Sequence, residues 1–259
     1  MATPAIIVAT FDQPRWLALA LRAWSAQSVR PAQVIVADDG SGGETRAVLE
    51  AAGAVHVRIE RDGVRFGKCS AVNAAVRRAR ELGCDLLLFT DGDCLPARDL
   101  LERHLREARP GRFLAGGVVR LSRAQSEALT PADVERFSFE RLPGDKRVYA
   151  LPRPLGRALD LLNPRRTPFK GGNSSAWLED IVRVNGYDER FGWGSEDKEL
   201  GTRLEHAGIR GYSIRYSAPV FHLWHERPYV NDAVIAANRA LLAETRRTRS
   251  MRAPVGLER

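Results

Sequence analysis

The sequence has few cysteines, and their arrangement argues against two classes of protein. The chain of 259 residues carries three, Cys69, Cys84 and Cys94, an odd number without a Cys-x-x-Cys pair. We therefore expect neither a disulfide framework nor a structural zinc site, and a reducing compartment fits this pattern. Long apolar runs are also missing, because stretches such as Leu86–Phe89 are far too short to span a bilayer.

The common glycine-rich phosphate loops are absent as well. The sequence holds no Gly-x-x-x-x-Gly-Lys-Ser/Thr and no Gly-x-Gly-x-x-Gly. A bound phosphate would therefore need a metal ion, Lys or Arg side chains, or isolated backbone amides. The net charge of +8, from 40 Lys and Arg against 32 Asp and Glu, favours anionic partners. It does not choose among nucleic acid, acidic lipid and phosphorylated substrates, and a solvated basic surface explains it equally well.

The order of the segments predicts the fold class. Short apolar runs typical of buried strands lie at residues 5–9, 34–37, 55–59, 86–89 and 113–119. Helical spacing is found at residues 14–28, 44–52, 67–82, 100–108, 195–207 and 231–245. This alternation predicts an α/β protein with one mostly parallel sheet and helices on both of its faces.

Three parts of the second half are less regular. Residues 209–216 and 218–222 are expected to form two separate strands. Residues 124–167 are rich in Arg and Pro with weak periodicity, and predict a short helix plus a surface excursion. The basic tail after Arg246 is expected to fray. No segment has the composition of a linker between independent domains.

Carboxylates follow two of the predicted strands. Asp38 and Asp39 end one strand, and Asp91 and Asp93 end another. Ligands of open α/β sheets bind outside the carboxyl ends of the strands. The first pair is by itself more typical of a turn, because Gly and Ser follow it. The second pair favours a divalent cation, since Mg²⁺ and Mn²⁺ share oxygen ligands with substrate phosphates.

Two further groups of polar residues have two readings each. The spacing of His222 and His225 allows both to face one metal ion. In the alternative interpretation, one is buried and the other is exposed. Glu196 and Asp197 open a predicted helix after an aromatic and glycine lead-in that contains Trp193. They either compensate the helix dipole or supply a general base.

Taken together and in order, these segments resemble the family-2 glycosyltransferases of the GT-A fold. The C-terminal half is similar to the galactosyltransferase-type domain of β-1,4-galactosyltransferases and of bacterial chondroitin-polymerase-like enzymes. The resemblance runs from about Ile6 to His225. It is carried by Val8–Phe11, Asp38–Ser41, Asp91–Asp93, Gly171–Asn173, Asn185–Asp188, Gly192–Asp197 and His222–His225.

The resemblance implies a role for each matched residue. Asp197 would be the catalytic base and Glu196 its acceptor- or sugar-binding partner. Asp93, His225 and His222 would hold Mn²⁺ or Mg²⁺. The nucleotide sugar would lie along Thr10, Phe11, Asp12, Asp39, Lys68, Asn73, Asp91, Gly171, Gly172, Asn173 and Trp193, with Asp39 at the base and Trp193 on a sugar face.

The implied activity is inverting, metal-dependent transfer of a sugar from a nucleotide-diphosphate sugar, usually UDP-linked, to an acceptor hydroxyl. The setting would be bacterial surface or secondary glycan synthesis. Residues 1–120 would form the nucleotide-sugar-binding half, residues 121–230 the acceptor-binding and catalytic half of the same domain, and residues 231–259 a C-terminal helix and basic tail. The acceptor would be a glycan, a lipid-linked glycan or a small molecule. The protein would be cytoplasmic, with peripheral contact to the inner face of the membrane at most.

Two alternatives remain open. A sugar-phosphate nucleotidyltransferase shares the fold class, but it should carry a Gly-rich basic loop after the first strand, where Thr10–Pro14 stands instead. A non-enzymatic nucleic-acid-binding protein would explain the basic charge, although no recognised binding module is present and we expect no nucleic-acid partner.

Overall fold

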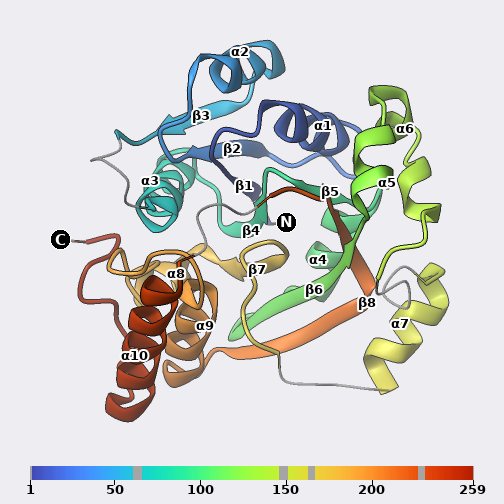
Figure 1. Cartoon of the computed structure of the whole chain (residues 1–259). Coiled ribbons are helices and arrows are strands. Elements are labelled where there is room, and N and C mark those ends of the chain that lie inside the picture. The colour runs from blue at the N-terminus through green and yellow to red at the C-terminus, as the bar shows by residue number, and fades with distance from the viewer. Residues whose placement is uncertain (1, 61–65, 146–150, 163–166, 227–230, 259) are drawn as a thin grey trace.

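The computed structural model describes residues 2–60, 66–145, 151–162, 167–226 and 231–258. Within them, one eight-stranded sheet has the order β3-β2-β1-β4-β7-β6-β8-β5 (Figure 1). The strands are β1 (Pro4–Thr10), β2 (Gln33–Asp38), β3 (Val55–Arg58), β4 (Leu86–Asp91), β5 (Cys94–Pro96), β6 (Arg112–Arg120), β7 (Ser174–Trp177) and β8 (Arg210–His222). Four of the seven strand pairs are parallel, which confirms the predicted mostly parallel sheet.

Helices cover both faces of the sheet, as predicted. They include α1 (Pro14–Ser25), α2 (Gly43–Ala52), α3 (Lys68–Glu81), α4 (Leu100–Glu107), α8 (Leu178–Arg183), α9 (Glu196–His206) and α10 (Asp232–Thr248). Because successive side chains of a strand point to opposite faces, β1 serves two cores. Ile6 and Val8 pack with residues of α1, α2 and α4, whereas Ala5 and Ile7 pack with residues of α3, α8 and α9.

The prediction of two strands over residues 209–222 is wrong. β8 is one strand of 13 residues. Its parallel register with β6 jumps from Gly116 opposite Ile214 to Gly117 opposite Pro219. The extra residues form a bulge, which disturbs the apolar pattern without ending the strand. The short strand β5, which the sequence did not predict, pairs antiparallel with the end of β8.

The prediction of a short helix plus a surface excursion is wrong for residues 123–142. This stretch forms α5 (Arg123–Ala128), α6 (Pro131–Glu135) and the 3₁₀ helix η1 (Ser138–Arg141), and α7 (Arg153–Leu162) follows. Ser122 and Thr130 start α5 and α6 with capping boxes. Val134 and Phe139 are fully buried. Helices of one or two turns are too short to show periodicity. Residues 146–150 and 163–166 of the predicted excursion lie outside the described residues.

The basic tail does not fray as predicted. Helix α10 continues to Thr248, and the chain then folds back against the loop that follows α8. Ala253 is 3% exposed, its N–H donates to the carbonyl of Val184, and its own carbonyl accepts from the Asn185 side chain at 2.8 Å. Single apolar residues in a basic tail show no periodic pattern, so the packing of the tail against the protein could not be predicted from the sequence.

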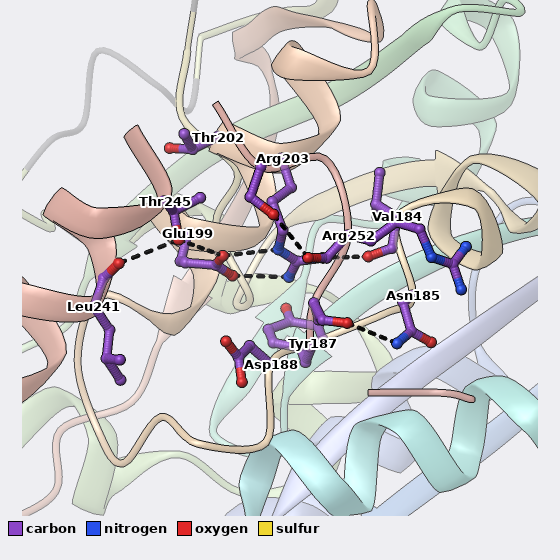
Figure 2. Close-up of polar contacts among 12 residues, drawn as sticks. Val184, Asn185, Tyr187, Asp188, Glu199, Thr202, Arg203, Leu241, Thr245 and Arg252 are labelled. Carbon is purple, nitrogen blue, oxygen red and sulfur yellow. Dashed lines mark hydrogen bonds and ion pairs between the residues drawn. The ribbon is translucent and has the colours of Figure 1, made fainter. Parts of the chain in front are cut away.

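A buried ion pair joins α9 to its neighbours (Figure 2). Arg203 and Glu199, one helical turn apart, are each about 1% exposed and form two hydrogen bonds of 2.7 and 2.8 Å. Glu199 also accepts from the Thr245 hydroxyl of α10, and Arg203 donates to the Val184 carbonyl. Such a pair requires all its partners, because a lone buried charge costs several kcal/mol. The network therefore fixes α9 against α10. Among the described residues, no helix combines the length and apolar character needed to cross a bilayer.

Candidate active site

A cleft of about 770 Å³ opens where β1, β2 and β4 end. Its walls come from the loop after β1, the start of α3, the segment 190–197 that leads into α9, the end of β8 and the first turns of α10. The carboxyl ends of parallel strands are the usual ligand edge of an α/β sheet. The cleft therefore lies where the sequence placed the acidic clusters.

Asp93 lies beside both histidines in this cleft. Its carboxylate oxygens are 3.0 Å from Nε2 of His225 and 3.7 Å from Nε2 of His222. The pairing of β5 with β8 explains this proximity, because it sets Cys94 opposite His222. One ligand atom from each of Asp93, His222 and His225 lies within 4.8 Å of the others. Carboxylate oxygen suits Mn²⁺ and imidazole nitrogen suits first-row transition metals, so a transition ion such as the expected Mn²⁺ fits this donor set.

The protonation of Asp93 also fits a cation site. Burial acts to raise its pKa, but the hydrogen bond from His225 and the charges of His222 and His225 outweigh it, so the pKa of Asp93 is lowered. The carboxylate thus stays ionised, as a metal ligand must.

Lys68 joins two acidic groups on the other side of the cleft. Its ammonium is 3.0 Å from Asp91 and 3.7 Å from Glu196. Burial acts to lower the pKa of Lys68, but the charges of Asp197, Asp91 and Glu196 together raise it well above its usual value. Burial and the charge of Asp197 raise the pKa of Glu196 to about 7, although Lys68 acts against this. The cluster therefore holds a permanent cation and a carboxyl that titrates near neutrality.

Asp197 is held from two sides. The buried hydroxyl of Tyr187 donates a 3.0 Å hydrogen bond to its Oδ1. On the other side lies Gly171, where a Cβ would overlap the Asp197 carboxylate. Gly172 stands in the same relation to Asp91, since a Cβ there would lie 3.1 Å from its Oδ2. The two glycines thus leave room for carboxylates.

Several residues expected along the nucleotide sugar do line the cleft: Thr10, Phe11, Asp39, Lys68, Asp91 and Trp193. Asp39 is 3% exposed, and its Oδ2 accepts the N–H of Gly67 at 2.9 Å. These six residues therefore lie in the cleft, and their contacts with the ligand stay a prediction.

Three polar residues expected along the nucleotide sugar, by contrast, do not line the cleft. The Oδ1 of Asp12 accepts the N–H of Gly42 and so ties the loop after β1 to α2. The amide of Asn73 is fully buried and bonds the backbone of Tyr187 on both its N–H and its carbonyl. Both side chains therefore support the framework of the site, and their contact with a ligand stays a prediction.

Asn173 is the third of these residues, and it too is a framework residue. Its amide donates to the carbonyls of Gly117 and Ala218 at 2.8 and 2.9 Å, across the bulge in β8. Its Oδ1 lies 3.0 Å from Nε2 of His104, whose pKa burial lowers to about 4. Gly171 and Gly172 likewise shape the cleft from behind the carboxylates instead of lining it.

Sequence reasoning missed two contributors to the cleft. Tyr187 lies in a segment that the resemblance had singled out, but its bond to Asp197 leaves no sequence signal. The first turns of α10, with the residue before it, supply Asn231, Val234 and Asn238 to the lining, whereas the sequence predicted only a C-terminal helix there.

Two family models match the chain. Residues 5–155, more than half of the chain, match the model of glycosyl transferase family 2. The chain belongs to this family. Residues 154–226 match a second family model, described as the N-terminal domain of galactosyltransferase, which confirms the resemblance seen in the C-terminal half.

Individual relatives of this family-2 glycosyltransferase are distant. The uncharacterized glycosyltransferase YfnE of Bacillus subtilis (strain 168) is 27% identical over 251 residues, covering 82% of this chain and 62% of the relative. The validoxylamine A glucosyltransferase of Streptomyces hygroscopicus subsp. limoneus is 30% identical over 222 residues, covering 79% and 48%. The chain thus spans less than two thirds of the length of either relative.

A solved structure shares the fold. The mannosyltransferase PcManGT from Pyrobaculum calidifontis, in complex with GDP-Man and Mn²⁺, aligns with a TM-score of 0.63 and 19% identity. The alignment covers 97% of this chain and 66% of that one. The GT-A-like fold expected from the sequence is therefore confirmed.

Proposed function

We propose that this family-2 glycosyltransferase moves a sugar from a nucleotide-diphosphate sugar to an acceptor hydroxyl with inversion at the anomeric carbon. One observation carries the proposal: Asp197 and the Asp93–His222–His225 group line the same cleft, at the ligand edge of the sheet. A base and a cation-binding group that face one space can act on one substrate.

In this mechanism, Asp197 takes the proton of the acceptor hydroxyl. The acceptor oxygen forms a bond to the anomeric carbon while the bond from that carbon to the diphosphate oxygen breaks, and the nucleotide diphosphate leaves with the electron pair. Inversion follows from a single displacement. The neighbouring carboxyl of Glu196 is turned to Lys68, so it binds and orients instead of attacking the sugar.

Asp93, His222 and His225 would hold the metal. When bound, the ion supplies positive charge that stabilises the diphosphate leaving group. Two imidazoles beside one carboxylate favour Mn²⁺ over Mg²⁺, because Mg²⁺ prefers oxygen ligands. The Mn²⁺ in the mannosyltransferase of similar fold supports the same choice.

Asp39 would recognise the base. An ionised carboxylate accepts hydrogen bonds but cannot donate them, so it favours a base that presents a ring N–H, which uracil and guanine do. We propose UDP, the usual nucleotide among the enzymes that the chain resembles, with a hexosyl or N-acetylhexosaminyl group attached. The glucosyl transfer named for the Streptomyces relative supports a hexose. A role in bacterial surface or secondary glycan synthesis follows from the same resemblance.

A donor panel tests this function. The protein is incubated with UDP- and GDP-linked hexoses and N-acetylhexosamines in Mn²⁺, in Mg²⁺ and in EDTA, and release of the nucleoside diphosphate is measured. We expect slow hydrolysis of a UDP-sugar that EDTA abolishes and that Asp197→Asn loses. Pyrophosphate release from a sugar phosphate and a nucleoside triphosphate would instead indicate a nucleotidyltransferase. Thermal stabilisation by an oligonucleotide but not by UDP and Mn²⁺ would indicate a nucleic-acid-binding protein.

A further inference from the structure

The C-terminal helix α10 forms one wall of the cleft. Asn231, Val234, Ala237 and Asn238 of its first turns line the cleft. Both family matches end before this helix, at residue 226 or earlier. The wall is therefore a feature of this chain beyond the matched family regions.

Asn238 is bonded to the loop that leads into α9. This side chain is 2% exposed. Its Oδ1 accepts the N–H of Gly192 at 3.2 Å, and its amide nitrogen donates to the carbonyls of Trp193 and Gly194 at 3.0 and 2.7 Å. Asn238 therefore forms three hydrogen bonds, to three consecutive residues. They occupy both of its amide donors and one of its acceptor sites, which is most of the hydrogen-bonding capacity of an asparagine side chain.

The loop needs such support. Gly194 and Ser195 have φ values of +99° and +74°, a region that is costly for serine. The Ser195 side chain makes no capping hydrogen bond to α9. Gly192 packs against Val234 so tightly that a Cβ there would lie 2.6 Å from its Cγ1. The conformation of the loop is therefore imposed by α10 as much as by its own residues.

We propose that Asn238 is a positioning residue for catalysis. By holding the backbone of Gly192–Gly194 it fixes Trp193 and the start of α9, and so keeps Asp197, two residues beyond Ser195, beside Tyr187. The catalytic part of this inference rests on the proposed function. The effect of Asn238 on the loop is independent of that function.

Two variants and a control test it. Asn238→Ala removes all three bonds, and Asn238→Asp keeps only the acceptor for Gly192. Thr245→Val is the control, because Thr245 is also a buried residue of α10 that bonds α9, but at Glu199, away from the loop. Hydrogen exchange at the Gly192 amide, followed by NMR, reports the loop, and donor hydrolysis gives kcat and KM.

In Asn238→Ala we expect exchange at Gly192 to rise by about tenfold or more, since local opening sets this rate. We expect kcat to fall about 10- to 100-fold, because small misplacements of a base cost that much, and donor KM to rise, because Trp193 is loosened with the loop. Asn238→Asp sets a carboxylate oxygen against the carbonyls of Trp193 and Gly194, so it should loosen the loop at least as far as Asn238→Ala. Thr245→Val should leave Gly192 and kcat near wild type even where its melting temperature drops as far.

Unchanged exchange at Gly192 in Asn238→Ala overturns the proposal, whatever the activity. Faster exchange with a kcat equal to that of Thr245→Val overturns the catalytic role. If the wild type hydrolyses no nucleotide sugar, the proposed function fails, and the exchange measurement still decides whether Asn238 holds the loop.

Discussion

The hydroxyl of Tyr187 donates a hydrogen bond of 3.0 Å to Oδ1 of Asp197. Tyr187 is itself fixed: it is 1% exposed, its ring lies 6.1 Å from that of Phe89, and its backbone N–H and carbonyl both bond the Asn73 side chain. Burial and the charge of Asp197 raise the pKa of Tyr187 well above its usual value, so it stays a donor. Asn73 thus acts on the site through Tyr187.

Tyr187→Phe should therefore disturb the base without disturbing the core. The phenyl ring keeps the packing, and only the hydrogen bond to Asp197 is lost. We expect kcat to fall about tenfold, because a carboxylate that can rotate is less often in line with the acceptor. The free energy of unfolding should fall by about 1.5–3 kcal/mol, the range for a hydrogen bond to a charged group. Donor hydrolysis and urea unfolding measure the two effects, and an unchanged kcat would show that the bond does not orient the base.

Gly171→Ala tests the space behind the same carboxylate. A Cβ at this position would overlap the Asp197 carboxylate, so the side chain must move. We expect kcat to fall about 10- to 100-fold for a displacement of around 1 Å. Gly53→Ala is unsuitable as a control because of its positive φ. Gly43→Ala in α2 is matched, because a Cβ there would meet only the end of the Arg46 side chain, at 4.0 Å. Equal activity of the two variants would contradict the placement of Asp197.

Asp197→Asn separates chemistry from binding. The amide keeps the shape of the side chain but cannot take a proton. General-base catalysis is worth about 10²–10⁴-fold, and kcat should fall by that factor. The affinity for the donor in Mn²⁺, measured by calorimetry, should stay close to wild type. Near-normal turnover would reject Asp197 as the base.

The sheet and its ligand edge could be predicted because β1, β2 and β4 are largely buried on both faces and contain plain apolar runs. The bulge in β8 could not, since the four extra residues 215–218 mimic a strand break. The docking of the tail through Ala253 could not either, because single buried residues leave no period. Short capped helices such as α5 could not be predicted either, because one or two turns are too short to show a helical period.

The site was predictable where acidic residues end strands, as Asp91 and Asp93 do. It was not predictable where a polar residue has two possible uses. Asn73 and Asn173 lie in motifs that the resemblance tied to the ligand, but their amides bond backbone groups of the protein. Asn238 lies beyond every motif, and only the packing of α10 against the loop at Gly192 reveals it.

The raised pKa of Glu196 predicts an unusual dependence of stability on pH. Its folded-state pKa of about 7 lies above its usual value of 4.5. Between these two values the folded state holds a proton that the unfolded state has released, so the free energy of unfolding falls as pH rises. At about 1.4 kcal/mol per unit, the total fall is of the order of 3 kcal/mol.

Glu196→Gln should remove this fall. Urea unfolding in EDTA at pH 5, 6, 7 and 8 should show the variant gaining on the wild type at each step up to about pH 7. The substitution also weakens the contact with Lys68. A difference in unfolding free energy that is the same at every pH does not affect this comparison. Parallel pH profiles of the two proteins would show that Glu196 titrates normally.

The central claim is that Asp93, His222 and His225 bind one cation in the cleft that Asp197 faces. Calorimetric titration of wild type and Asp93→Ala with a UDP-sugar, each with Mn²⁺ and with EDTA, tests it most directly. We predict tight, metal-dependent binding to the wild type and, for Asp93→Ala, weak binding that Mn²⁺ does not improve. Metal-dependent affinity that survives in Asp93→Ala would contradict the account.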